Sequence, residues 1–221
     1  MIDIAGNLHR VLGRIENAAK RAGRPPGSVQ LLAVTKTVSV DHIREALACG
    51  VTRIAENRLQ EALAKRELLA SVKLSWHFIG HLQTNKAKKV VENFDCVHSV
   101  DRVELAEALA RQVFNRAPLP VLIEVKLQEE QNKSGISERD LPALVSAVRA
   151  LQSLDLRGLM AIPPPVDDPE QARPYFQRLR MLAEDLGLSE LSMGMTHDFE
   201  VAVEEGATMV RIGTGLFGSR P

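Results

Sequence analysis

Lys36 is the residue whose type and position point most directly to chemistry. It follows the apolar run 31–34 and Thr35, so its ammonium group would lie at the end of a buried strand, partly shielded from water. The ordinary pKa of a lysine is about 10.4, and partial burial disfavours the charged form, which leaves more of the neutral amine that attacks an aldehyde. A solvated lysine without a chemical role is the simpler interpretation of this position alone.

Two segments near the C-terminus form a candidate phosphate site. Residues 192–198 are expected to run from a strand through a turn into a helix, and Thr196 or Asp198 would cap that helix. Its N-terminus would offer free backbone amides and a positive dipole end. In the segment 211–215, Gly213 and Gly215 would let the backbone approach the same anion closely. Capping residues and turn glycines explain either segment by itself, whereas two such segments together favour a phosphate.

The elements that must position these residues alternate along the whole chain. Short apolar segments alternate with helical patterns, which indicates parallel strands. The expected strands are 29–34, 53–57, 75–80, 96–100, 121–127, 156–162, 191–195 and 209–213, and the helices between them are 41–49, 59–70, 86–92, 103–115, 141–151, 170–186 and 199–205. Eight such units predict an α/β protein with one domain over residues 1–221, a single (β/α)8 TIM barrel whose functional residues gather at the C-terminal ends of the strands.

The first helical pattern precedes any strand. Apolar residues recur at helical spacing from Ile4 to Ala19, and the pattern ends at Gly23. No helix of any length fits after the eighth strand. We therefore expect this additional N-terminal helix to complete the outer ring or to cover the barrel floor.

Composition excludes several classes of function. The 221 residues contain 28 Lys and Arg against 28 Asp and Glu, so no net charge attracts nucleic acid or an anionic membrane. The two cysteines, Cys49 and Cys96, lie in apolar stretches and are expected to be small buried hydrophobes, and no paired Cys/His spacing predicts a metal. His77, beside Trp76 and Phe78, is expected to be a satisfied barrel histidine. No secretory signal or membrane span is recognised, so we expect a cytoplasmic protein, and a monomer.

A lysine after the first strand, facing a phosphate cradle after the last two, suggests pyridoxal 5′-phosphate (PLP) held as a Schiff base. The sequence motifs resemble those of the YggS/PROSC family of PLP homeostasis proteins. They are LAVTKT at 32–37, ENRLQE at 56–61, WHFIG at 76–80, KSG at 133–135, RGLMAIP at 157–163, LSMGM at 191–195 and VRIGT at 210–214. The resemblance runs in the same order from about residue 29 to residue 220.

The resemblance implies a barrel like the N-terminal domain of alanine racemase, with the cofactor on Lys36. It further implies a set of cofactor-binding residues: Asn57, Met195, Thr196, Arg211, Gly213 and Thr214. Thr196 stands where the family often has Ser, which keeps the hydroxyl, and Ala55 stands where many members have Gly. Val38 replaces a lysine found in some members, so a function that depends on that second lysine is not expected here.

The resemblance also implies a protein that buffers or delivers PLP to PLP-dependent apoenzymes without catalysing a reaction. The alternative is a racemase-like enzyme, which requires a second base opposite the lysine. In the alanine racemases that base is a tyrosine from another domain, whereas Tyr175 is the one tyrosine of this chain and is expected to pack in a helix. A barrel enzyme acting on a sugar phosphate is a third possibility, and it would not need Lys36.

Overall fold

Eight parallel strands close into a barrel in the computed structural model, which describes residues 2–128 and 134–218. Each strand pairs with its neighbours in chain order, and pairing between β4 and β5 and between β1 and β9 closes the ring. The barrel strands are β1 (Gln30–Val34), β2 (Arg53–Glu56), β3 (Ser75–Phe78), β4 (Cys96–Val100), β5 (Leu119–Lys126), β7 (Leu154–Met160), β8 (Glu190–Met195) and β9 (Met209–Ile212). The predicted (β/α)8 TIM barrel with an additional N-terminal helix is confirmed.

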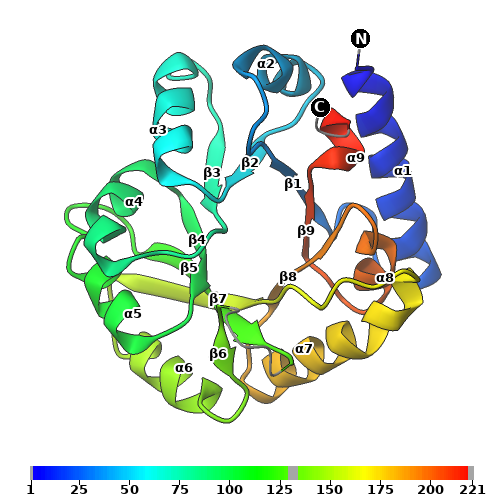
Figure 1. Cartoon of the computed structure of the whole chain (residues 1–221). Coiled ribbons are helices and arrows are strands. Elements are labelled where there is room, and N and C mark those ends of the chain that lie inside the picture. Colours follow the sequence, from blue (N-terminus) through cyan, green and yellow to red (C-terminus); the bar gives the residue numbers. More distant parts are fainter. Residues whose placement is uncertain (1, 129–133, 219–221) are drawn as a thin grey trace.

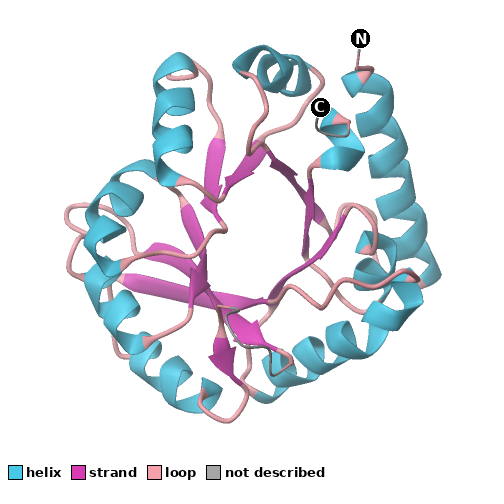
Figure 2. Cartoon of the chain, viewed as in Figure 1, coloured by secondary structure: helices cyan, strands magenta, loops and turns pink. Residues whose placement is uncertain are grey.

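Helices surround this barrel (Figures 1 and 2). They are α1 (Ile4–Arg21), α2 (Val40–Ala48), α3 (Leu59–Leu68), α4 (Ala87–Asn93), α5 (Val103–Ala110), α6 (Leu141–Arg149), α7 (Arg173–Asp185), α8 (Phe199–Glu204) and α9 (Thr214–Phe217), with 3-10 turns η1 (Thr84–Lys86) and η2 (Pro169–Ala172). The predicted elements are all present, with ends that differ by a few residues. The largest difference is α5, which stops at Ala110 where the apolar pattern predicted residue 115.

The N-terminal helix takes its place in the outer ring, as expected. The side chain of Asp3 accepts the amide of Gly6 at 2.8 Å and begins α1, and the buried face of the helix repeats at helical spacing through Leu8, Val11 and Ile15. This face packs on α8, α9 and α2 (Figure 1). Because α9 has one turn only, α1 supplies the cover that the last strand would otherwise lack.

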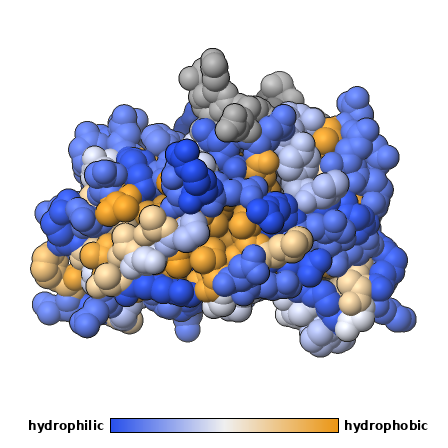
Figure 3. Space-filling model, turned by 90° about the horizontal axis from the view of Figure 1, so that it is seen from below, coloured by the Kyte–Doolittle hydropathy of each residue, from blue (hydrophilic) through white to orange (hydrophobic). Residues whose placement is uncertain are grey.

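Alternation along the strands separates two apolar layers. Residues that point into the barrel pack together in the centre, among them Leu32, Val34, Cys96, Met160 and Met209. Their sequence neighbours point outward and pack against the helices, as alternation in a strand requires. The surface in Figure 3 is mostly hydrophilic, with apolar residues gathered near the centre of that face. No described helix is both long and apolar enough to cross a membrane.

Two short elements were not predicted. The strand β6 (Ile136–Ser137) pairs with β5 outside the barrel, through Val125 and Ile136. The helix α9 follows β9 directly. Each is too short to leave a periodic pattern in the sequence.

Candidate functional site

Lys36 lies at the mouth of the barrel, directly after β1. Leu32 and Val34 point into the barrel, so alternation predicts the inward side for residue 36 too. Lys36 is half-buried and lines a hollow of about 500 Å³, which Gly213 and Thr214 in the neighbouring loop after β9 also line. The structure therefore brings the predicted amine and part of the predicted phosphate cradle into one opening.

The backbone on both sides of Lys36 is held by a buried polar network. Thr35 Oγ1 donates to Glu56 Oε1 at 2.6 Å, and Lys65 Nζ donates to the same carboxylate oxygen at 2.8 Å and to the carbonyl oxygen of Thr35. On the other side, Glu61 Oε1 accepts the Thr37 amide and the Lys65 ammonium. Lys65 thus connects the residues before and after Lys36.

The backbone conformation of Thr37 also shows that the loop around Lys36 is held in place. Its φ of 63° lies in the left-handed region, which a β-branched residue rarely adopts. The bond from the Thr37 amide to Glu61 holds this conformation in place. The loop that carries Lys36 is therefore fixed by contacts with α3 as well as by β1.

Burial and pairing act in opposite directions on the two carboxyl groups of this network. Burial raises the pKa of Glu56, and the hydrogen bonds from Lys65 and Thr35 offset only part of that effect. For Glu61, burial alone would raise the pKa, but the hydrogen bonds from Lys65 and the Thr37 amide outweigh it and lower the pKa. The ammonium of Lys65 is the cation that makes this buried arrangement tolerable.

The predicted cradle is assembled from the loops after β8 and β9. Thr196 Oγ1 accepts the amide of Gly215 at 3.2 Å, so the two loops are in direct contact. A Cβ added to Gly213 would lie 3.5 Å from the carbonyl oxygen of Val34, which places the end of β9 beside the end of β1. Asp198 occupies the N-cap position of α8, as one of the two predicted residues, but its side chain accepts the amide of Met195 and makes no capping hydrogen bond. Phosphate binding here stays a prediction.

Arg211 is buried inside the barrel, and its guanidinium is already occupied. It donates to the carbonyl and hydroxyl oxygens of Ser192 and to the carbonyl oxygen of Ala161. Burial lowers its pKa to about 10. Met195, by contrast, is 37% exposed at the end of β8.

Asn57 follows β2 and offers an unused polar atom. Its side-chain oxygen is buried and has no hydrogen-bond partner among the described residues. A Cβ at Gly80 would lie 2.2 Å from the backbone oxygen of Asn57, so only glycine permits this close approach of the loops after β2 and β3. An unpartnered buried oxygen at the end of β2, the strand beside β1, fits a polar ligand such as PLP.

Some residues of this site were not predicted. Glu61 and Lys65 have the i, i+4 spacing of an ordinary surface pair, and their burial against Thr35 could not be seen from that spacing. Cys96 is buried as expected, but the expectation for Cys49 is wrong, since it is exposed at the C-terminal end of α2. Lys133, the first residue of the KSG motif, lies outside the described residues.

The fold and the polar residues at the mouth define a class of TIM barrel. Comparison with known proteins identifies the same class. Residues 7–221 match the family model described as "Alanine racemase, N-terminal domain". The alanine racemase of Corynebacterium glutamicum has the same fold, with a TM-score of 0.70 and 18% identity, and this chain covers 61% of that longer chain.

Much more similar proteins narrow the class. The pyridoxal phosphate homeostasis protein of Pseudomonas aeruginosa is 50% identical over 223 residues, which cover 100% of this chain and 97% of the relative. The structure of PipY from Synechococcus elongatus with PLP bound has a TM-score of 0.86 and 41% identity, and the match covers 98% of this chain and 100% of that one. The chain belongs to the family of pyridoxal phosphate homeostasis proteins, as its motifs indicated.

Proposed function

We propose that this protein binds PLP through Lys36 and takes part in PLP homeostasis, by buffering the cofactor or delivering it to PLP-dependent apoenzymes in the cytoplasm. The observation that carries the proposal is the shared hollow of Lys36, Gly213 and Thr214. An amine and small backbone residues that line the same hollow match an aldehyde and a phosphate on one ligand. The relative crystallised with PLP supports the same ligand.

The remaining residues have separate tasks in this proposal. Asn57 would bind a polar substituent of the ring with its unused side-chain oxygen, and Thr196, Gly213 and Thr214 would surround the phosphate next to Met195. Arg211 would limit the depth of the site, because its bonds to Ser192 and Ala161 keep a buried positive charge below the mouth. Bound PLP supplies an electrophilic aldehyde and an electron sink.

We also propose that the protein catalyses no reaction. The racemase alternative needs a second base opposite Lys36. Tyr175 lies on α7, in the helix where it was expected to pack, is half-buried, and its hydroxyl donates to the side-chain oxygen of exposed Gln128 at 3.4 Å. The similar racemase fold belongs to a longer chain, and its low identity supports no shared activity.

One experiment distinguishes a PLP carrier from a racemase. Purified protein loaded with PLP is mixed with the apo form of a PLP-dependent enzyme, and recovered activity is followed, with free PLP at the same concentration as reference. Racemisation of a panel of amino acids is measured in parallel. Recovery of the apoenzyme without racemisation supports the proposal, whereas turnover that is lost in Lys36→Ala would establish the enzyme.

A further inference from the structure

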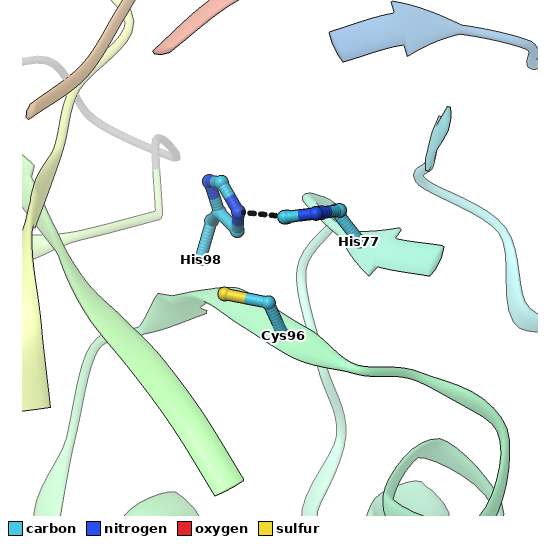
Figure 4. A group of neighbouring side chains, drawn as sticks. All are labelled: His77, Cys96 and His98. Atoms are coloured by element: carbon cyan, nitrogen blue, oxygen red, sulfur yellow. Dashed lines mark hydrogen bonds between the residues drawn. The ribbon is translucent and has the colours of Figure 1, made fainter. Parts of the chain in front are cut away.

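Three potential metal ligands meet inside the barrel, away from Lys36: His77 on β3, and Cys96 and His98 on β4. His77 and Cys96 are paired in the β3–β4 register, and His98 lies two residues beyond Cys96, so all three point to the inner face. Their ligand atoms lie within 4.8 Å of one another, and all three residues are buried. Figure 4 shows the two imidazoles directed at each other with the Cys96 sulfur beside them.

The imidazoles are oriented as in many metal sites. His77 Nδ1 and His98 Nε2 are 2.8 Å apart, and each ring directs its other nitrogen to a hydroxyl group. His77 Nε2 lies 3.2 Å from Ser75 Oγ, and His98 Nδ1 lies 2.9 Å from Ser192 Oγ. Metal-bound histidines almost always have such a second partner, which fixes the ring and its tautomer.

We propose that His77, Cys96 and His98 form a binding site for copper(I), with two imidazole nitrogens and one thiolate as ligands. Soft thiolate ligands favour copper(I), and imidazole also suits copper. The charge of the interior decides between this ion and zinc. A zinc ion with one thiolate would leave a net positive charge beside buried Arg211, whereas copper(I) with one thiolate is neutral.

The protonation states of the free protein are compatible with this site. Burial lowers the pKa of His77 to about 4 and also lowers the pKa of His98, so both imidazoles are neutral at pH 7. One of the two facing nitrogens carries the proton of the hydrogen bond between the rings, and on binding this proton moves to the other nitrogen of the same ring, which faces a serine hydroxyl, so that both facing nitrogens can bind the ion. Burial raises the pKa of the Cys96 thiol. Binding therefore replaces the thiol proton, which is released to solvent, and the copper keeps its oxidation state.

The ion requires a small rearrangement. Metal–nitrogen bonds of about 2.0 Å, at the angle of about 120° of a three-ligand site, place two nitrogens about 3.5 Å apart, so the imidazole nitrogens, now 2.8 Å apart, must separate by about 0.7 Å. The hydrogen bond between them is then replaced by two bonds to the metal. Around Cys96 the interior consists of Leu122, Met160 and Met209, which exclude water and favour a soft ion.

The ion would enter from the floor of the barrel. An open depression of about 530 Å³ is lined by Ser75, Asp95 and their neighbours, and Ser75 already contacts His77. Asp95, which precedes Cys96 directly, lines this depression together with the cations Arg53 and Lys73. The route is on the side of the barrel opposite to the mouth, so copper would not have to pass Lys36.

A competition experiment with the full-length protein tests the proposal. Copper(I) is supplied without oxygen as its complex with a coloured chelator, and the loss of colour measures its transfer to the protein. We expect one equivalent to be bound. Cys96→Ser should lower the affinity more than about tenfold, whereas Cys49→Ser, which changes the exposed cysteine, should leave it unchanged. Circular dichroism establishes that each variant is folded.

A second measurement avoids dependence on the variants. X-ray absorption of the copper-loaded wild-type protein should show one sulfur and two nitrogen neighbours. Failure of the protein to withdraw copper, a copper shell without sulfur, or a loss of binding in Cys49→Ser would overturn the site. Zinc that displaces copper(I) at equal concentration would overturn the choice of ion.

Discussion

The ammonium of Lys65 lies 2.8 Å from Glu56 Oε1, and the side chains are 8% and 0% exposed. This pair connects α3 to β2 behind the mouth of the barrel. The same ammonium also bonds to the carbonyl oxygen of Thr35, next to Lys36. A charged group behind the strands therefore determines how the reactive loop is held.

Replacing this cation should affect both stability and ligand binding. Lys65→Met leaves Glu56 buried without its partner, and breaking a buried pair in this way typically costs about 3–5 kcal/mol in the free energy of unfolding. The loop around Lys36 loses the bond from Lys65 to the Thr35 carbonyl oxygen, and Glu61, which holds the Thr37 amide, loses its cation, so the affinity for PLP should also fall. Urea unfolding and PLP titration measure the two effects.

An exposed pair provides the control for this variant. Lys88 and Glu92 are 3.9 Å apart and 72% and 54% exposed, so Lys88→Met should change the unfolding free energy by less than about 1 kcal/mol. Equal losses in the two variants would show that Lys65 has no special structural role.

Gly80 should tolerate no side chain. An added Cβ would lie 2.2 Å from the backbone oxygen of Asn57, and overpacking of this kind typically costs about 1–3 kcal/mol. Because Asn57 must shift, Gly80→Ala should bind PLP more weakly than the wild type. Gly13 in α1 has no atom within 4 Å of an added Cβ, so Gly13→Ala should raise the unfolding free energy by about 0.5–1 kcal/mol. Unchanged PLP affinity in Gly80→Ala would remove Asn57 from the site.

The ionic contact between the N-terminal helix α1 and α8 should weaken as the pH falls. Glu204 on α8 contacts Arg21 of α1 at 2.7 Å and Arg173 of α7 at 2.8 Å. Burial alone would raise the pKa of Glu204, but the hydrogen bonds from these arginines outweigh it and lower the pKa. The unfolded chain therefore binds more protons below the ordinary value of 4.5, and the free energy of unfolding falls as the pH decreases through the folded pKa.

Unfolding followed as a function of pH tests this linkage. Glu204→Gln should be less stable than the wild type at pH 7 and should show a shallower loss of stability on acidification. Glu92→Gln, which changes the exposed carboxyl group near Lys88, should follow the wild-type curve. A Glu204→Gln curve parallel to the wild type would contradict the assigned role.

The barrel could be predicted from the sequence. The proximity of Lys36 and Gly213 could be predicted as well, because a closed barrel of parallel strands places the first and last strands side by side. The sequence was insufficient where partners come from several elements. Lys65 reaches Thr35 and Glu56 only because α3 packs behind β1 and β2. His77 and Cys96 meet through strand register. The predicted extension of α5 failed because Val113 continues the apolar spacing, although its amide already bonds to Ala110 in a turn.

The identity of the lysine that binds PLP tests the account most directly. The protein is incubated with PLP, reduced with borohydride, digested and analysed by mass spectrometry, alongside Lys36→Ala and the control Lys126→Ala, which changes another lysine near the strand ends. We predict one reduced cofactor on the peptide that contains Lys36, a visible absorption band that Lys36→Ala abolishes, and normal labelling of Lys126→Ala. An intact band in Lys36→Ala, or a label on any other lysine, would contradict the account.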